Sequence, residues 1–128
     1  MSLLNALLGN ASDVDPAEVE RDYAHVLLPG EAVEVAFRMV RDLYVFTDWR
    51  MLLIDRQGLT GRKVELMTVP YRSITAFSVE TAGTFDMDSE LKVWVSGQNG
   101  PIQRTLKKGA NIEGVQKAIS AGISGRAG

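Results

Sequence analysis

The stretch that decides the fold covers residues 31–58 and reads EAVEVAFRMVRDLYVFTDWRMLLIDRQG. Its first part alternates between apolar and other residues, which indicates a half-buried strand. We expect one face of this strand to carry Val33, Val35, Phe37 and Met39, and the opposite face to carry Glu34, Ala36 and Arg38. Two short apolar runs follow, at residues 43–46 and 51–54, and the four residues between them suit a tight hairpin. The stretch therefore predicts three consecutive antiparallel strands.

Toward the C-terminus, four more strand-like segments follow, each bounded by turn residues: residues 64–69, 74–81, 90–96 and 102–106. Pro70 ends the first of them, because proline has no N–H to give to a central strand. Asn111 is a plausible cap for a last helix that carries Ile112, Val115, Ile119 and Ile123 on one face, and we expect the glycine-rich residues 122–128 to fray. Strands that follow one another without intervening helices predict an antiparallel sandwich or barrel, since a parallel sheet needs helical crossovers.

Toward the N-terminus, Asp15-Pro16-Ala17-Glu18 has the residues of a helix start: a capping carboxylate, a proline in the first turn and a glutamate three residues after the cap. An apolar stripe follows and stops at Pro29-Gly30; it consists of Val19, Tyr23, Val26 and Leu27. Four leucines at positions 3, 4, 7 and 8 also have helical spacing. We predict a helical extension over residues 1–30 that docks on the barrel or on a neighbouring subunit, and one domain over residues 31–124.

Composition excludes several classes of site. The 128 residues include no cysteine, which removes disulfides, thiolate nucleophiles and zinc sites that need sulfur. A net charge of -2 gives no general attraction to nucleic acid or to an anionic membrane, so any basic site must be local. The first eight residues have neither the charge nor the length of a secretory signal, and we expect a cytoplasmic protein.

No motif in the chain indicates catalysis. His25 is the single histidine, and no G-x-S-x-G pentapeptide is present to supply a nucleophilic serine. Asp86, Asp88 and Glu90 alternate and have the oxygens a hard cation needs, but they lack the EF-hand pattern and suit an acidic loop between strands better. We therefore predict no enzyme activity, no cofactor and no metal.

Two segments resemble the bacterial pleckstrin-homology-like (PH-like) family. They are residues 43–55, in which a strand ends in Phe46-Thr47 and Arg50 opens the next one, and the later step Pro70-Tyr71-Arg72-Ser73-Ile74. Residues 77–86 also resemble a signature of one subgroup of that family. The likeness covers roughly residues 28–123 and implies a PH-like barrel of about seven antiparallel strands in two near-orthogonal sheets, capped by a C-terminal helix. The last helix departs from eukaryotic members because it lacks their tryptophan.

The resemblance further implies binding or assembly without catalysis, with a tendency to form rings. Our leading hypothesis is a module that associates with copies of itself, through contacts from Leu4, Leu8, Val19, Tyr23 and Val26. A second hypothesis is a peripheral binder of anionic lipid or of another anionic ligand. Its candidate contacts are Arg38, Arg41, Arg50, Arg62, Lys63, Lys107 and Lys108, and because Asp42 and Asp48 lie among the first three, the phosphoinositide site of eukaryotic relatives is not carried over. We predict no nucleic acid partner, and the sequence identifies no other protein partner.

Overall fold

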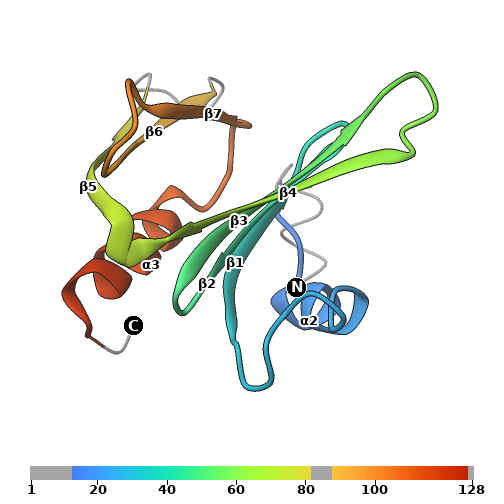
Figure 1. Cartoon of the computed structure of the whole chain (residues 1–128), viewed down its shortest axis with the longest axis horizontal. Coiled ribbons are helices and arrows are strands. Elements are labelled where there is room, and N and C mark those ends of the chain that lie inside the picture. Colours follow the sequence, from blue (N-terminus) through green and yellow to red (C-terminus); the bar gives the residue numbers. More distant parts are fainter. Residues whose placement is uncertain (1–12, 82–87, 127–128) are drawn as a thin grey trace.

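The computed structural model describes residues 13–81 and 88–126, which form two antiparallel sheets and two α-helices (Figure 1). One sheet has the strand order β1-β2-β3-β4 and the other has the order β5-β6-β7. In chain order the elements are α2 (Pro16–Asp22), β1 (Val33–Arg38), β2 (Asp42–Thr47), β3 (Arg50–Gln57), β4 (Lys63–Pro70), a 3-10 turn (Tyr71–Ser73), β5 (Ile74–Glu80), β6 (Ser89–Val95), β7 (Ile102–Leu106) and α3 (Ile112–Ser124). The predicted PH-like architecture is confirmed, and every predicted strand is present within one residue of its predicted ends, except that β3 continues three residues further, to Gln57.

The alternation predicted for the first strand is wrong at its start. The register between β1 and β2 shifts between Val33 and Val35, which marks a β-bulge. A bulge adds one residue to one strand and turns the side chains before it to the other face. Val33 therefore packs with Ala36 on the outer face of the sheet, while Val35 and Phe37 remain on the inner face.

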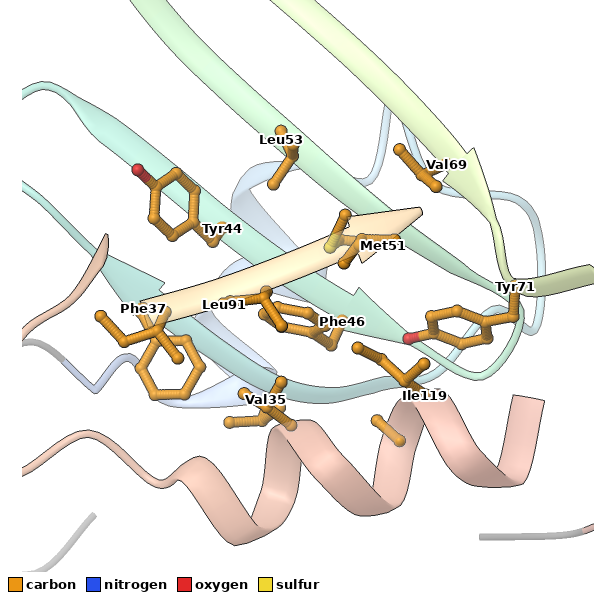
Figure 2. Packing of buried hydrophobic residues seen from close by; sticks show 14 of the residues in the cluster. Val35, Phe37, Tyr44, Phe46, Met51, Leu53, Val69, Tyr71, Leu91 and Ile119 are labelled. Atoms are coloured by element: carbon orange, nitrogen blue, oxygen red, sulfur yellow. The ribbon is translucent and has the colours of Figure 1, made fainter. Parts of the chain in front are cut away.

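The inner face of the four-stranded sheet forms the main core together with the second sheet and α3. Figure 2 shows Val35, Phe46 and Ile119 pointing toward one another between the strands and the helix, and all three are buried. Tyr71 closes one end of this core, where its hydroxyl donates to the carbonyl of Thr47 at 2.8 Å. Its ring lies so close to α3 that a Cβ added to Gly122 would be 1.9 Å from it. Glycine is therefore required at the point where the helix crosses Tyr71.

The outer face carries a second apolar cluster beneath α2. The buried residues of this cluster come from the helix and from three strands: Val19, Val33, Ala36, Leu43, Val45, Leu52 and Ile54. Val14, Tyr23, Val26 and Leu27 pack against them while partly exposed. In Figure 1 the four-stranded sheet accordingly lies between α2 and the second sheet.

The start of α2 is as predicted, but its end is earlier. The carboxylate of Asp15 accepts from the N–H of Ala17, and Pro16 is the first helical residue. The helix ends at Asp22, and the chain continues to Leu27 in turns that still bring Tyr23, Val26 and Leu27 onto the sheet. Packing on the sheet therefore sets the path of this segment after regular helix ends.

The cap of α3 at Asn111 is confirmed, since its side chain accepts from the N–H of Gly114 at 3.0 Å. The fraying expected from residue 122 is wrong for the first part of that segment. The helix continues to Ser124, and Gly125 ends it in the left-handed conformation with φ 74°. Across the described ranges, no helix has the length and apolar character needed to cross a bilayer.

Candidate functional site

Arg50 is buried and forms an ion pair inside the protein, so its prediction as a contact for an anionic ligand is wrong. Its guanidinium donates to the two carboxylate oxygens of Glu31 at 2.8 and 3.0 Å. Further donors reach the hydroxyl of Thr68 at 3.0 Å and the carbonyl of Val26 at 3.2 Å. The positive charge is thus neutralised within the fold, and the pair joins the segment after α2 to β3.

The same ion pair changes the acidity of Glu31. Burial alone would raise the pKa of this carboxyl, but the hydrogen bonds from Arg50 and from the N–H of Leu28 outweigh burial and lower the pKa to about 2. Glu31 therefore remains ionised at every physiological pH. The sequence alone does not reveal this pair because its two residues are 19 positions apart.

Three of the predicted basic residues gather at the end of the β3–β4 hairpin, which projects beyond the rest of the domain (Figure 1). Arg41, in the β1–β2 loop, donates to the carbonyl of Gly58 in the β3–β4 loop and so joins the two loops. Arg62 is the last residue of that loop, Lys63 is the first residue of β4, and both are exposed. Beside them, Val40 is 92% exposed and Leu59 is fully exposed. The tip thus combines positive charge with apolar side chains in water.

The other predicted basic pair lies elsewhere. Lys107 and Lys108 follow β7 on the second sheet, where both are exposed, and the N–H of Lys108 donates to the carboxylate of Asp88. Glu90 accepts from the hydroxyl of Thr105. Asp86 lies outside the described residues, and within the described ranges no three His, Cys, Asp or Glu side chains are arranged to hold a metal ion.

The predicted contacts for self-association are mostly used within the chain. Val19 is 2% exposed in the outer cluster, so its assignment as a contact between subunits is wrong for the folded chain. Tyr23 and Val26 are half-buried against the same sheet. Leu4 and Leu8 lie outside the described residues.

A groove lies on the outer face of the sheet, between the end of α2 and strand β4. This outer-face groove has a volume of about 550 Å³ and an apolar lining of Tyr23, Val26, Ile54, Val64 and Leu66. Its polar rim consists of Asp22, His25, Arg38 and Arg56, and the ring of His25 stacks on that of Tyr23. Among the predicted basic residues, Arg38 therefore borders an apolar surface, with Glu18 at 4.0 Å as its counter-ion.

Strand β4 forms one edge of the four-stranded sheet. Just beyond the strand end, the N–H of Tyr71 donates to the carbonyl of Trp49, so these two residues form a hydrogen-bonded pair that fixes the alternation along β4. Hydrogen-bonded and non-hydrogen-bonded pairs alternate along an antiparallel ladder, so every second residue of β4 points its N–H and C=O away from β3. In the register of the two strands these outward residues are Val64, Leu66 and Thr68. We call this row of outward groups the β4 edge.

The β4 edge differs from the other strand edges. Asp13 and Val14 cover part of β1, where the N–H of Val14 donates to the carbonyl of Ala36. On β5 and β7 the exposed side chains are small or polar: Thr75, Ala76, Ser78, Glu80, Gln103 and Thr105. Within the described part of the chain, Val64 and Leu66 are the large apolar side chains exposed on strands, at 44% and 49%. These two are functional candidates that sequence reasoning missed, because alternation alone did not show that the outer cover stops short of β4.

A second feature that the sequence did not show is a group of charged side chains between the four-stranded sheet and the second sheet. Asp42 and Asp55 are paired across β2 and β3, and Arg104 of the second sheet lies 3.8 Å from Asp55. Burial raises the pKa of Asp55, with a further contribution from Asp42 that Arg104 opposes. The arrangement links the two sheets through Arg104 and Asp55.

Comparison with known proteins agrees with this geometry. The family model for the bacterial PH domain matches residues 2–123. The uncharacterized protein YjqA of Bacillus subtilis (strain 168) is 52% identical over 122 residues, which span 94% of this chain and 98% of that protein.

Two crystal structures are also similar. A DUF1696 family protein with a pleckstrin-homology domain from Shewanella loihica PV-4 shares 46% identity and a TM-score of 0.80, over 88% of this chain and 96% of that one. A pleckstrin homology domain from Shewanella amazonensis SB2B shares 48% identity and a TM-score of 0.73, over 95% and 98%.

Proposed function

The chain belongs to the bacterial PH domain family, and on that premise we propose that it is a non-catalytic interaction module that associates with copies of itself through the β4 edge. The observation that carries this proposal is an edge strand of eight residues, beside whose outward N–H and C=O groups residues 13–81 and 88–126 place no further strand. Such an edge is a template for pairing with another chain.

Two further features favour this edge over the others. The β3–β4 hairpin projects from the domain (Figure 1), so a second molecule has access to it without a clash with α3 or the second sheet. Val64 and Leu66 add apolar surface directly beside the outward backbone groups. Natural proteins usually protect such edges with charge, proline or a cover. The outward residues Val64, Leu66 and Thr68 carry no charge, and the exposed Glu65 lies on the opposite face of the strand by alternation.

Solution mass tests the proposal. The chain of 14.0 kDa should show a mass above that of a monomer at tens of micromolar in light scattering or sedimentation. Val64→Lys places an ammonium group on the edge and should shift the protein to monomer. Gln103→Lys adds the same charge on β7 and serves as the matched control, with the mass of the unmodified chain. A strict monomer at these concentrations, or a Val64→Lys variant that still associates, would overturn the proposal.

A second candidate function is binding to an anionic lipid surface through the hairpin tip. It is supported by the position of Arg41, Arg62 and Lys63 around the exposed side chains of Val40 and Leu59. Basic residues near an anionic bilayer contribute about 1 kcal/mol each, and an apolar side chain at the tip adds burial in the interface.

Vesicle sedimentation tests this second candidate. Binding to phosphatidylserine vesicles should be present at low salt and weaken at physiological salt, since the Debye length falls to about 8 Å there. Arg62→Glu with Lys63→Glu should abolish sedimentation, while Lys107→Glu with Lys108→Glu, on the other sheet, should leave it unchanged. If the protein stays in the supernatant at low salt, this candidate is excluded.

A further inference from the structure

The outer-face groove interrupts an otherwise continuous apolar layer. One transverse row of the sheet runs through Arg38, Leu43, Ile54 and Leu66, which are cross-strand neighbours in succession. Leu43 and Ile54 are each 2% exposed, whereas Leu66 at the end of the row is 49% exposed. A leucine side chain that is half exposed forgoes part of the free energy that its burial would give. The exposed apolar lining of the groove is therefore suited to contact with another apolar segment.

The path of the chain at Asp13 points to the occupant. Asp13 forms an antiparallel bridge with Phe37, and the N–H of Val14 donates to the carbonyl of Ala36. Because the pairing is antiparallel, the residues before Asp13 leave toward Arg38. Arg38 is both the first residue of the transverse row and part of the groove rim. The described chain thus begins beside the rim of the groove.

The length of the preceding segment matches the width of the sheet. Strands lie ~4.8 Å apart and Asp13 pairs with the outer edge of β1, so β3 is roughly 14 Å and β4 roughly 19 Å from Asp13. The five steps from Asp13 back to residue 8 span at most ~17 Å when extended, and four further residues at the rise of a helix add ~6 Å. Leu8 therefore has sufficient reach to lie over Ile54, and Leu4 to lie over Leu66, in the same chain.

The chemistry of the segment suits the groove. Residues 1–12 contain no charged side chain and carry leucine at positions 3, 4, 7 and 8. Covering the groove with them brings no unpaired charge against its apolar lining. Arg38 and Arg56 lie on the rim, where their guanidinium groups remain in water.

We infer that the outer-face groove is the docking site for residues 1–12 of the same chain, with the leucine stripe packed on Tyr23, Ile54 and Leu66. The docked segment completes the outer layer and leaves the outward N–H and C=O groups of β4 open. The inference stands beside the proposed function and does not depend on it.

Cysteine pairs test the docking, since the chain has no cysteine of its own. Leu8→Cys with Leu66→Cys, and Leu4→Cys with Leu66→Cys, are made in the full chain and oxidised at 10 µM or below. At least one pair should close an intramolecular disulfide, because the effective concentration within one chain is on the order of mM. Closure should be roughly a hundredfold faster than cross-linking between chains. Leu8→Cys with Gln103→Cys, on the other sheet, is the control and should not close.

Mixing two single variants separates this inference from self-association. Equal amounts of the Leu8→Cys chain and the Leu66→Cys chain form a heterodimer only if the segment docks on another molecule. A disulfide within one chain in the double variants, with no heterodimer in the mixture, supports the inference. A heterodimer in the mixture, or no disulfide in either double variant, overturns it. A monomeric mass beside an intramolecular disulfide would reject the proposed function alone.

Discussion

The two faces of the four-stranded sheet are closed to different extents, although they belong to the same strands. The inner face is covered by the second sheet and α3, and Val35, Phe46, Leu53 and Val69 on it are all below 10% exposed. On the outer face the described cover is α2, which reaches β1 to β3 and stops before β4. The inner core therefore specifies the barrel, while the outer layer is a separate cover held by a few defined contacts.

The largest expected effect comes from breaking the Arg50–Glu31 ion pair, which holds the outer layer. Arg50→Met removes the partner of Glu31, whose side chain is 1% exposed, and leaves a buried carboxylate without its counter-ion. We expect the free energy of unfolding to fall by ~3–5 kcal/mol in urea titration. Arg50→Met with Glu31→Leu removes both charges and should recover most of that loss. If the single variant is as stable as the unmodified chain, the ion pair does not hold the layer.

Acid should release the same contact without a substitution. The pKa of Glu31 is lowered from 4.5 to about 2 in the folded protein, so its stabilising effect is complete above pH 4.5 and is lost as the pH falls through 2. The loss should reach roughly 3 kcal/mol across this window. Asp13 and Asp55 have raised pKa values and act in the opposite direction.

The measurement is therefore the difference in unfolding free energy between the unmodified chain and the Arg50→Met, Glu31→Leu variant from pH 5 to pH 2. A difference that does not change with pH would contradict the assignment to Glu31.

The inner core is tested next, at the crossing of α3 and Tyr71. Gly122→Ala adds a methyl group 1.9 Å from the Tyr71 ring, so α3 must shift despite the better helix propensity of alanine. Overpacking of this kind costs ~1–3 kcal/mol, which thermal and urea unfolding will detect. Ser124→Ala, exposed on the same helix, should change stability little. An unchanged melting temperature for Gly122→Ala would show that the core tolerates a wider helix separation.

The smallest expected effect comes from removing the helix caps, of which each layer has one. Asp15→Ala removes the cap of α2 and Asn111→Ala removes the cap of α3, and each cap contributes ~1 kcal/mol to its helix. If the outer layer opens separately, Asp15→Ala should increase amide hydrogen exchange in residues 16–27 with little change in the global unfolding free energy. Asn111→Ala should lower the global value. Equal global losses would mean that both layers unfold together.

The sequence predicted the features that depend on residues close together in the chain, namely the strands and the starts of the two helices. Alternation placed the strands, Asp15-Pro16 placed the start of α2 and Asn111 the start of α3, because these signals act within a few residues. The resemblance of residues 43–55 and 70–74 then predicted the arrangement of the sheets, and the family match confirms it.

What the sequence did not predict depends on residues far apart in the chain. As an arginine in a loop between apolar runs, Arg50 suited a ligand contact in the sequence, but in the fold it pairs with Glu31. Val19 lies on an apolar stripe that suited a subunit contact, but in the fold it is buried against the sheet. The bulge at Val33 and the exposure of Leu66 likewise follow from strand register. Register and long-range ion pairs have no local signature, so the candidate site required the structure.

The position of the Arg50–Glu31 pair has a mechanical consequence. If the described part of the chain is pulled from Asp13, the force first meets the short pairing of Asp13 and Val14 with β1 and then α2. It next reaches Glu31, where the guanidinium of Arg50 anchors the chain to β3 immediately before β1 begins. Unravelling should therefore halt at residue 31 with both sheets intact.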